Sequence, residues 1–460
     1  MNKKLSFILV ALAFSVVLFS DCNNPAPEPE PETIPDPVDL VDLKSSVPVT
    51  EDWVFSDKPR LTIHVENPNE VEVEANAKMR ITTDLKKEVT TVEKTVKVPA
   101  KGKVDIDMTT DGNLDPGFYR AICSVDGRLS RNFFFGISPT KIVSAPDKQD
   151  DFDAFWEDGK KQLEAIDMKA ELTEITSKSS AARKVYLVEM QSVPDGLTGD
   201  PVIIRGYYCE PQDGQKHKVL LHFYGYDEQN SKSKIYCPAG GSSTDYAEFY
   251  LSHRGQYLNN RPASSREPDG KGDIVNPYGD WFAFNFGDKD CYYYRGAFLD
   301  CVQAIRFLAT RPTSDMNNLF AEGSSQGGAL TYAAAALSDY PFAAIAPCVA
   351  FLGDFPDYFK IVSWPGDTAK KKQKEAGLSD EEMYRFLSYF DTKNLATRIS
   401  CPVIASVCLQ DGTCPPHTNI APYNNLLSTD KEVYFYPELQ HEIPSNWPSK
   451  YSAFFKARVR

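Results

Sequence analysis

The chain has 460 residues, which is enough for two or three domains of roughly 150 residues each. Hydrophobic residues make up 42% of it and charged residues 25%, which excludes disorder for the bulk of the chain. Its 64 Asp and Glu against 50 Lys and Arg give a net charge of −14. This balance argues against a nucleic-acid partner, because affinity for polyphosphate depends on clustered positive charge.

The first 21 residues have the organisation of a secretory signal peptide. Lys3 and Lys4 precede an apolar run over residues 5–19, which is short for a membrane span and typical of an exported leader. The leader ends in Phe-Ser-Asp-Cys, which is similar to the site where a lipoprotein leader is cut before a lipid-bearing cysteine. We therefore expect lipidation of Cys22, with ordinary secretion and an unmodified Cys22 as the alternative.

Residues 22–45 are predicted to be an extended tether. They contain PAPEPEPETIPDPV, in which proline alternates with carboxylates. Such a segment cannot pack into a core and favours an extended, charged chain. A lipid, a stalk and then folded domains form the order of a cell-envelope lipoprotein. The expected location is the cell envelope, with a lipid as the sole membrane anchor and the protein facing the periplasm or the cell surface.

Residues 46–142 are predicted to form an all-β, immunoglobulin-like sandwich. Apolar and polar residues alternate at period two through five segments that turn residues separate, as in half-buried antiparallel strands. We expect a spacer or docking role rather than carbohydrate binding, because Trp53 is the one tryptophan of this region. The five segments are 60–67, 71–84, 90–99, 103–110 and 118–125.

Residues 143–460 are predicted to form an α/β domain. Apolar strand-like runs alternate with helical segments such as 151–166 and 296–310, and this order is typical of a mainly parallel sheet with helices on both faces. The strand-like runs are 185–192, 202–211, 218–225, 248–255, 280–287, 319–323, 342–351, 401–409 and 433–437.

The nine cysteines beyond Cys22 are an odd number without a C-x-x-C pair. Several, including Cys209 and Cys408, lie in apolar strand-like runs, where a free cysteine behaves as a small hydrophobic residue. We expect them to fill the core, and a single disulfide bridge stays open as the alternative. No metal site is expected.

Gly323-Ser324-Ser325-Gln326-Gly327 has the G-x-S-x-G spacing of a nucleophile elbow. A strand-like run precedes it and an Ala-rich helical segment follows it, which is the setting that this motif requires. The glycines let strand and helix approach closely, and the start of the helix points backbone amides at an incoming oxyanion. Ser325 is therefore the predicted nucleophile, with a glycine-rich packing turn as the alternative.

A catalytic serine in this setting is followed along the chain by an acid and then by a histidine. Two histidines follow Ser325, His417 and His441. His441 lies in a loop after the last strand-like run, and Asp411 directly follows the run before it. We assign His441 as general base and then acid, and Asp411 as the group that orients the imidazole. The alternatives are a surface turn for Asp411 and a helix cap for His441.

An oxyanion hole takes a second backbone amide from the loop after an early strand. The turn Tyr224-Gly225-Tyr226 follows the strand-like residues 218–223, and its glycine gives access to the backbone. We expect the amides of Tyr226 and Gln326 to be the two donors. A plain turn at the end of the strand is the alternative.

Several motifs occur in a fixed order after residue 145. They are DFDAFW, Arg254-Gly255-Gln256, DKDCYYYRGAFLDCVQAIRFL, Gly323-Ser324-Ser325-Gln326-Gly327-Gly328, SYFDTKNLATRISCPV and His441-Glu442. Together they resemble the acetyl xylan esterase / cephalosporin C deacetylase family of carbohydrate esterases. The resemblance covers about residues 145–460 and leaves the N-terminal sandwich outside.

The resemblance implies an α/β-hydrolase fold that removes acetyl groups from small sugars and related alcohols without a metal or cofactor. It carries the triad onto Ser325, Asp411 and His441 and the oxyanion donors onto the two amides named above. It also implies that Arg254 and Gln256 brace the elbow rather than react. Members of the family often assemble as hexamers, so the resemblance allows a homo-oligomer.

The expected function is a carbohydrate O-deacetylase that acts on acetylated xylan or oligosaccharides through an acetyl-enzyme on Ser325. Tyr224 departs from the family, which usually has histidine there, so the wall beside the oxyanion loop differs. A serine peptidase of the same fold is one alternative function. A non-catalytic surface lipoprotein that binds polysaccharide is the other.

Overall fold

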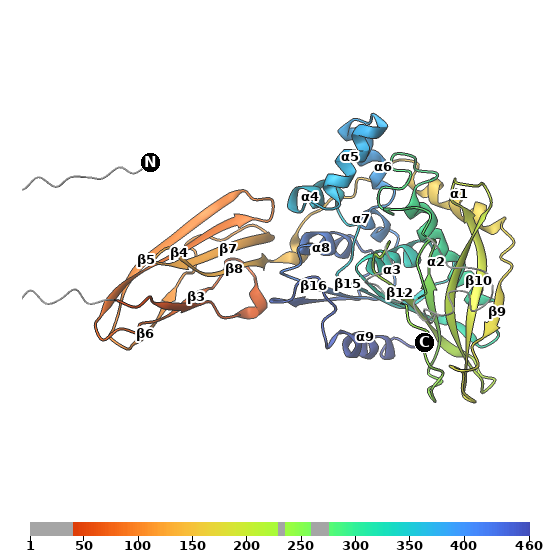
Figure 1. Ribbon diagram of the computed structural model, residues 1–460, viewed down its shortest axis with the longest axis horizontal. Helices are drawn as coiled ribbons and strands as arrows, with labels where there is room; N and C mark the ends of the chain where they lie inside the picture. The colour runs from red at the N-terminus through yellow and green to blue at the C-terminus, as the bar shows by residue number, and fades with distance from the viewer. Residues whose placement is uncertain (1–39, 229–234, 259–275) are drawn as a thin grey trace, which may run out of the picture. The chain divides into compact units, whose positions relative to one another are not determined.

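The computed structural model describes residues 40–228, 235–258 and 276–460 (Figure 1). The predicted leader, the lipidation site Cys22 and most of the tether lie outside these residues. No helix in the described ranges is long and apolar enough to cross a membrane. The chain from Asp42 to its C-terminus forms one compact unit.

The first strands of this unit form two sheets. Their strand orders are β1(Lys44–Ser46)–β3(Thr62–Glu66)–β6(Lys103–Asp107) and β2(Val54–Phe55)–β8(Arg128–Ile137)–β7(Gly117–Val125)–β4(Val73–Thr83)–β5(Glu88–Val98). Pairing is antiparallel except between β2 and β8, which run parallel over two residues. Side chains alternate between buried and exposed along β4 and between buried and half-buried along β7, as period-two sequences require. Trp53 stacks on Phe133 in their core, with ring centroids 4.0 Å apart.

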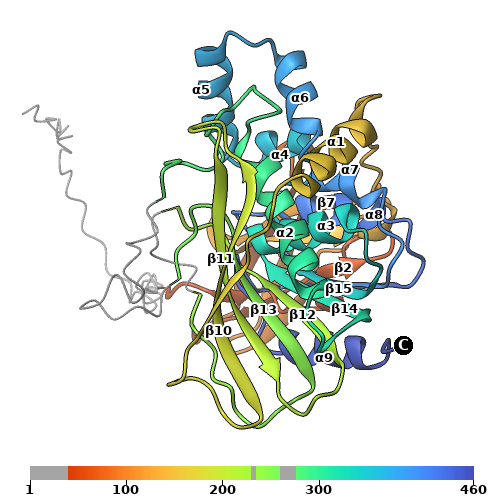
Figure 2. The ribbon, with the colours of Figure 1, turned by 90° about the vertical axis from the view of Figure 1, so that its right-hand side faces the viewer.

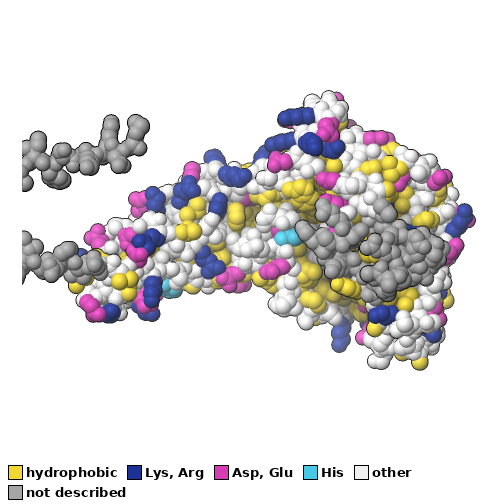
Figure 3. All heavy atoms as spheres, viewed as in Figure 1, with side chains coloured by type: hydrophobic (Ala, Val, Ile, Leu, Met, Phe, Trp, Pro, Cys, Tyr) yellow, Lys and Arg dark blue, Asp and Glu magenta, His cyan; other side chains and the backbone are white. Residues whose placement is uncertain are grey.

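The period-two pattern correctly predicted strands β3 to β7, whereas β8 was missed. Three consecutive phenylalanines, Phe133 to Phe135, interrupt the alternation of β8. The backbone of Phe134 bonds to Gln410, in the C-terminal part of the chain. On the face in Figure 3, positive and negative side chains are interspersed over these strands. Ion pairs within these strands include Arg80 and Glu88, 2.7 Å apart. The immunoglobulin-like classification and the domain boundary at 142 stay predictions.

The rest of the chain is built on a nine-stranded sheet that is parallel between six of its strands (Figure 2). The antiparallel pairs lie at one end of the sheet. In order, the strands are β17(Lys431–Tyr436), β16(Val403–Cys408), β15(Phe342–Cys348), β14(Ser314–Ser324), β12(His217–Phe223), β13(Tyr246–Ser252), β11(Pro201–Pro211), β10(Arg183–Pro194) and β9(Glu171–Glu174).

Helices cover both faces of this sheet, which confirms the predicted mixed α/β architecture. The helix α9(Trp447–Lys456) packs on one face through Phe455, whose ring lies 4.8 Å from that of Phe320 on β14. The helices α2(Tyr293–Ala309) and α3(Gln326–Leu337) lie on the other face (Figure 2). The remaining helices are α1(Phe152–Glu164), α4(Phe355–Ile361), α5(Gly366–Ala376), α6(Asp380–Ser388), α7(Thr392–Ala396) and α8(Pro416–Asn424).

The predicted strand over residues 280–287 is wrong. The segment forms successive turns, in which the Asp280 carboxylate accepts the backbone N–H groups of Phe282 at 2.9 Å and Ala283 at 3.2 Å. Its apolar residues are buried by packing on helix α2, where Trp281 stacks on Tyr293 with centroids 5.2 Å apart. The apolar residues of this segment therefore indicate that it is buried, and not that it pairs as a strand.

The described cysteines are all free, and most of them are buried, which confirms that they fill the core. Burial raises the pKa of Cys209 to about 12, so its thiol stays protonated and behaves as an apolar group. The alternative of one disulfide bridge is not realised among these residues.

Candidate active site

Ser325 lies in the sharp turn between strand β14 and helix α3, as the elbow motif predicted. Its backbone is left-handed, with φ 59° and ψ −122°, a conformation that costs about 1–3 kcal/mol for a residue with a side chain. Close packing imposes this turn. A Cβ on Gly323 would collide with the carbonyl oxygen of Gly327, and a Cβ on Gly327 would collide with that of Phe223 on β12. Both positions therefore need glycine.

His441 lies between Ser325 and Asp411. Its Nε2 is 2.9 Å from Ser325 Oγ, and its Nδ1 is 2.7 Å from Asp411 Oδ2. The second carboxylate oxygen of Asp411 accepts the backbone N–H groups of Thr413 and Cys414, each at 2.8 Å. The Asp411 side chain is only 1% exposed, which excludes a surface turn. These three residues, predicted from their order along the chain, thus form a continuous hydrogen-bonded chain.

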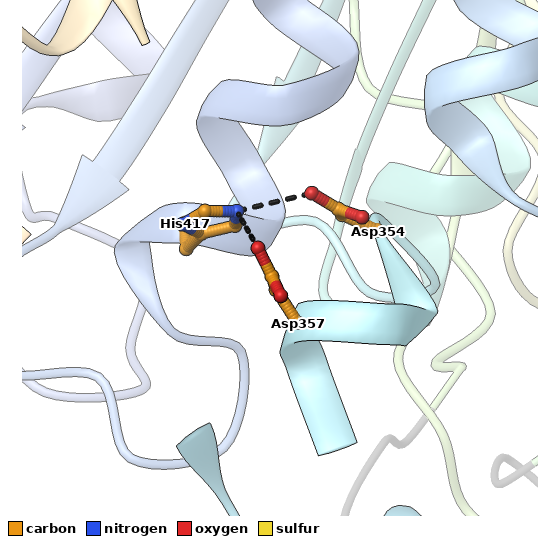
Figure 4. Close-up of side chains that lie close together, drawn as sticks. All are labelled: Asp354, Asp357 and His417. Atoms are coloured by element: carbon orange, nitrogen blue, oxygen red, sulfur yellow. Dashed lines mark hydrogen bonds and ion pairs between the residues drawn. The ribbon is translucent and has the colours of Figure 1, made fainter. Parts of the chain in front are cut away.

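His417, the other histidine that follows Ser325, lies in a separate cluster of carboxylates (Figure 4). Its Nε2 is 3.0 Å from Asp354 and 3.5 Å from Asp357, while its Nδ1 is 3.3 Å from Asp84. Burial alone would lower the pKa of His417, but the hydrogen bonds to Asp354 and Asp84 outweigh it and raise this pKa to about 10. His417 is therefore a cation at neutral pH and cannot accept a proton from a nucleophile.

Ser144 lies 3.4 Å from His417 Nε2, which makes it the second serine near a histidine and a carboxylate. It follows the short turn that ends at Lys141 and does not lie between a strand and a helix. Because its histidine is already protonated, Ser144 lacks a base. The arrangement around Ser144 is therefore not a second catalytic triad.

Asp354, Asp357 and His417 are close enough to hold a metal ion. The positive charge that such carboxylates require is already supplied by neighbouring side chains. Lys393 Nζ lies 2.9 Å from the other oxygen of Asp354 and is itself buried. The donor set therefore fits an ion-pair network between α4, α8 and Lys393 better than a metal site.

Gln326, the first residue of α3, is fixed by its side-chain amide. The Tyr294 hydroxyl donates to its Oε1 at 2.9 Å, and its Nε2 donates to His253 Nε2 at 2.9 Å. Burial lowers the pKa of His253 to about 4, so this imidazole is neutral and can accept. Its Nδ1–H in turn donates to the Tyr293 hydroxyl at 2.9 Å. The backbone N–H of Gln326, in the unbonded first turn of the helix, is thereby held in place.

The sequence-based assignment missed His253, Tyr293 and Tyr294. A signal for them was present, because His253 directly precedes the Arg-Gly-Gln motif and both tyrosines belong to a motif segment that carries the family resemblance. Their roles become apparent only through contacts with Gln326, which lies more than 30 positions further along the chain.

The loop at Tyr226 is held from two sides. Gln256 Nε2 donates to the carbonyl oxygen of Gly225 at 3.2 Å, and the Tyr226 hydroxyl donates to Asp280 at 2.8 Å. The Tyr226 ring packs edge-on against Trp281 and Trp364, at 5.1 and 5.4 Å. The side chain is thus tied away from the backbone, as an amide donor at this position would require.

Arg254 and Gln256 support the site indirectly. Arg254 pairs with Asp300 on α2 through its Nε at 2.9 Å and its Nη2 at 2.8 Å, and both side chains are almost fully buried. Its guanidinium fills the space beside Gly296, where a Cβ would collide with it. Arg254 therefore fixes helix α2, and this helix presents the Tyr294 hydroxyl to the side chain of Gln326. Neither Arg254 nor Gln256 forms a described hydrogen bond with Ser325.

Three comparisons with known proteins agree. Residues 140–459 match the model of the family described as acetyl xylan esterase (AXE1). The chain is 26% identical over 424 residues to acetyl esterase Axe7A of Xylanibacter ruminicola, and the alignment covers 90% of each chain. It therefore includes most of the N-terminal strands.

Two solved structures align with 70% of this chain and 98% of their own, both with a TM-score of 0.56. One is an acetyl xylan esterase from Paenibacillus sp. R4, which is 27% identical. The other is acetyl xylan esterase 1 from Thermoanaerobacterium sp. JW/SL YS485, at 23% identity, and it supports the fold alone.

Gly327→Ala should destabilise the protein by about 1–3 kcal/mol, because the added Cβ meets the backbone of Phe223 and strand and helix must separate. Denaturant unfolding followed by circular dichroism measures this effect. Gly112→Ala is the matched control, since a Cβ there meets nothing within 4 Å. Equal unfolding midpoints for the two variants would contradict the close approach at the elbow.

The ion pairs of His417 should make stability depend on pH. The pKa is raised in the folded chain, so the stabilisation is complete below the ordinary histidine pKa of about 6.5 and is lost as the pH rises towards about 10. The difference in unfolding free energy between the wild type and His417→Gln should therefore be larger at about pH 6 than at about pH 10. His64→Gln, at an exposed position, is the control. A difference that grows with pH would contradict the assigned charge.

Proposed function

The chain belongs to the acetyl xylan esterase family, and from this premise we propose that it is a serine esterase that removes O-acetyl groups from carbohydrates such as acetylated xylan and its oligosaccharides. The observation that carries the proposal is the hydrogen-bonded chain from Ser325 through His441 to Asp411 at a strained elbow. The large, mainly parallel sheet agrees with an α/β-hydrolase fold.

Acylation begins at Ser325. Its Oγ attacks the acetyl carbonyl carbon while His441 Nε2 takes the hydroxyl proton, and Asp411 stabilises the imidazolium through the Nδ1–H bond. The carbonyl oxygen becomes an oxyanion that accepts the backbone N–H groups of Tyr226 and Gln326. His441 then gives its proton to the sugar oxygen as the carbon–oxygen bond to the sugar breaks, which leaves an acetyl group on Ser325.

Deacylation repeats these steps with water. His441 takes a proton from a water molecule, whose oxygen attacks the acetyl carbon, and then returns a proton to Ser325 Oγ as acetate leaves. The thiol of Cys414 lies beside Ser325 but does not compete with it. Burial holds the pKa of Cys414 well above its usual range, so it stays protonated.

Aromatic rings cluster beside the backbone of Ser325, and we infer that they line the acyl side of the site. The backbone N–H of Phe351 donates to the carbonyl oxygen of Ser325 at 3.0 Å, and the Phe351 ring stacks on Trp364 with centroids 5.2 Å apart. Tyr226 contacts both rings. A small acetyl methyl group would fit beside such rings, whereas a longer acyl chain needs an open slot.

Lipidation at Cys22, a location in the cell envelope and self-association stay predictions. Cys22 and the leader lie outside the described residues, and the structure contains a single chain.

The triad assignment predicts that Ser325→Ala and His441→Ala each lower kcat by about 10⁶, because nucleophile and base act as a unit. The rate is measured with p-nitrophenyl acetate, and circular dichroism confirms folding. Ser144→Ala is the matched serine control and should retain kcat within about twofold. An inactive Ser144→Ala together with an active Ser325→Ala would reverse the assignment.

The substrate is tested by acetate release from acetylated xylo-oligosaccharides, alongside p-nitrophenyl acetate, butyrate and octanoate. We expect release from the oligosaccharides and a kcat/KM at least about tenfold lower for butyrate than for acetate, because we infer that aromatic rings line the acyl side. EDTA should leave the rate unchanged, since none of the proposed steps uses a metal ion. Faster cleavage of octanoate would indicate a lipase-like pocket, and rapid cleavage of a proline-containing peptide amide would favour the peptidase alternative.

A further inference from the structure

The loop that begins at Asp411 is bonded at its N-terminal end to β8, one of the N-terminal strands. The side chain of Gln410 accepts the backbone N–H of Phe134 on β8 at 2.9 Å and donates to the carbonyl oxygen of the same residue at 3.0 Å. This pair of bonds has the form of a β-ladder. It lies just beyond Gly136 and Ile137, where the short strand β2 stops pairing with β8.

Gln410 joins the same strand to the loop that carries His441. The second hydrogen of its Nε2 donates to the carbonyl oxygen of Pro437 at 2.7 Å, and its backbone N–H donates to that of Leu439 at 3.0 Å. The side-chain amide therefore has all its hydrogen-bonding groups engaged. One residue, adjacent to Asp411, ties together the acid loop, the histidine loop and β8.

A second contact reaches the histidine loop from β8. Arg131 lies 2.6 Å from Glu438, three residues before His441. The Arg131 guanidinium also donates to the carbonyl oxygen of Val47 at 3.1 Å and stacks on Trp53, 4.6 Å from the ring centroid. Because these contacts pre-orient Arg131, its ion pair costs less side-chain entropy than an ordinary surface pair.

A third contact holds the far end of the acid loop. His417 begins the helix that follows this loop, and its Nδ1 faces Asp84 in the turn between β4 and β5 at 3.3 Å. Asp84 is only 11% exposed. The loop from Asp411 to His417 is thus held by the N-terminal strands at both ends.

From these three contacts we propose that the N-terminal strands act as a brace that positions Asp411 and His441 for the reaction, with Gln410 as the central positioning residue. The proposal rests on the proposed function, and it gives these strands a role beyond the spacer or docking role expected from the sequence. Its physical basis is that reacting groups must be held close to their productive geometry, since a misplacement of about 1 Å can lower a rate by about 10².

Gln410→Leu tests the brace, because leucine has a similar size but forms none of the three side-chain bonds. We expect kcat for p-nitrophenyl acetate to fall about ten- to hundredfold, with KM within about twofold of the wild type. Arg131→Ala removes the ion pair with Glu438 and should lower kcat about two- to fivefold. Circular dichroism measures how much the loss of the Arg131 contacts with Val47 and Trp53 lowers stability. The matched control for Arg131→Ala is Arg80→Ala, since the carboxylate partner of Arg80 is Glu88 within the N-terminal strands.

A second readout separates positioning from stability. The proton on His441 Nδ1, shared with Asp411, gives a far-downfield ¹H NMR resonance that is assigned by its loss in His441→Gln. This resonance should shift and broaden in Gln410→Leu and stay unchanged in Arg80→Ala. An unchanged resonance in Gln410→Leu, or a rate that falls only in proportion to the unfolded fraction measured by circular dichroism, would overturn the brace.

The NMR readout also distinguishes this proposal from the proposed function. If the wild type releases no acetate from any acetylated sugar or from p-nitrophenyl acetate, the esterase function fails. A resonance that still moves in Gln410→Leu would then support the brace on its own. If the wild type is active and both readouts of Gln410→Leu match those of Arg80→Ala, the brace fails and the esterase function stands.

Discussion

The left-handed backbone of Ser325 is the constraint on which the rest of the site depends. Such a conformation persists only where the surroundings enforce it. Here the Ser325 N–H donates to Cys348 on the neighbouring strand at 2.9 Å, its carbonyl oxygen accepts from Phe351 at 3.0 Å, and Gly327 packs against the backbone of β12. Because three neighbouring segments fix one residue, the Ser325 hydroxyl is held 2.9 Å from His441 Nε2. The same turn begins α3 at Gln326, whose amide is one of the two proposed oxyanion donors.

Burial lowers the pKa of each buried histidine, and the charge of its hydrogen-bond partners decides whether the imidazole is neutral or cationic. His253 has neutral partners, and burial lowers its pKa to about 4. Burial also lowers the pKa of His222, but the hydrogen bonds to Glu248 and Glu322 outweigh this effect and raise the pKa to about 9. His417 is a cation for the same reason. The neutral imidazole of His253 accepts from the side chain of Gln326, and the cationic imidazoles form ion pairs between elements, so neither kind can replace His441 in its proposed role as the base.

The sequence was sufficient where a pattern is local. Period-two and apolar patterns predicted most strands, and helical patterns predicted α1, α2 and α3. The elbow motif with the order of acid and histidine led to the three residues that the structure brings together. It was insufficient where the determining contact joins distant segments. The run at 280–287 is apolar because it packs on α2, and the alternation of β8 is lost at Phe134, whose backbone bonds to Gln410. Gln410 and Phe134 are 276 positions apart, and neither carries a motif.

The bonds between Gln410 and Phe134 satisfy two requirements at once. An open strand edge exposes unpaired backbone groups and is prone to pair with other chains, and β8 would have such an edge beyond the two residues that β2 covers. The side-chain amide of Gln410 satisfies that edge at Phe134 in the manner of a peptide group. Since the same amide also binds the histidine loop at Pro437, the bond that covers this part of the edge also ties β8 to the loops of Asp411 and His441. Folding of the N-terminal strands and alignment of the catalytic residues are thereby coupled.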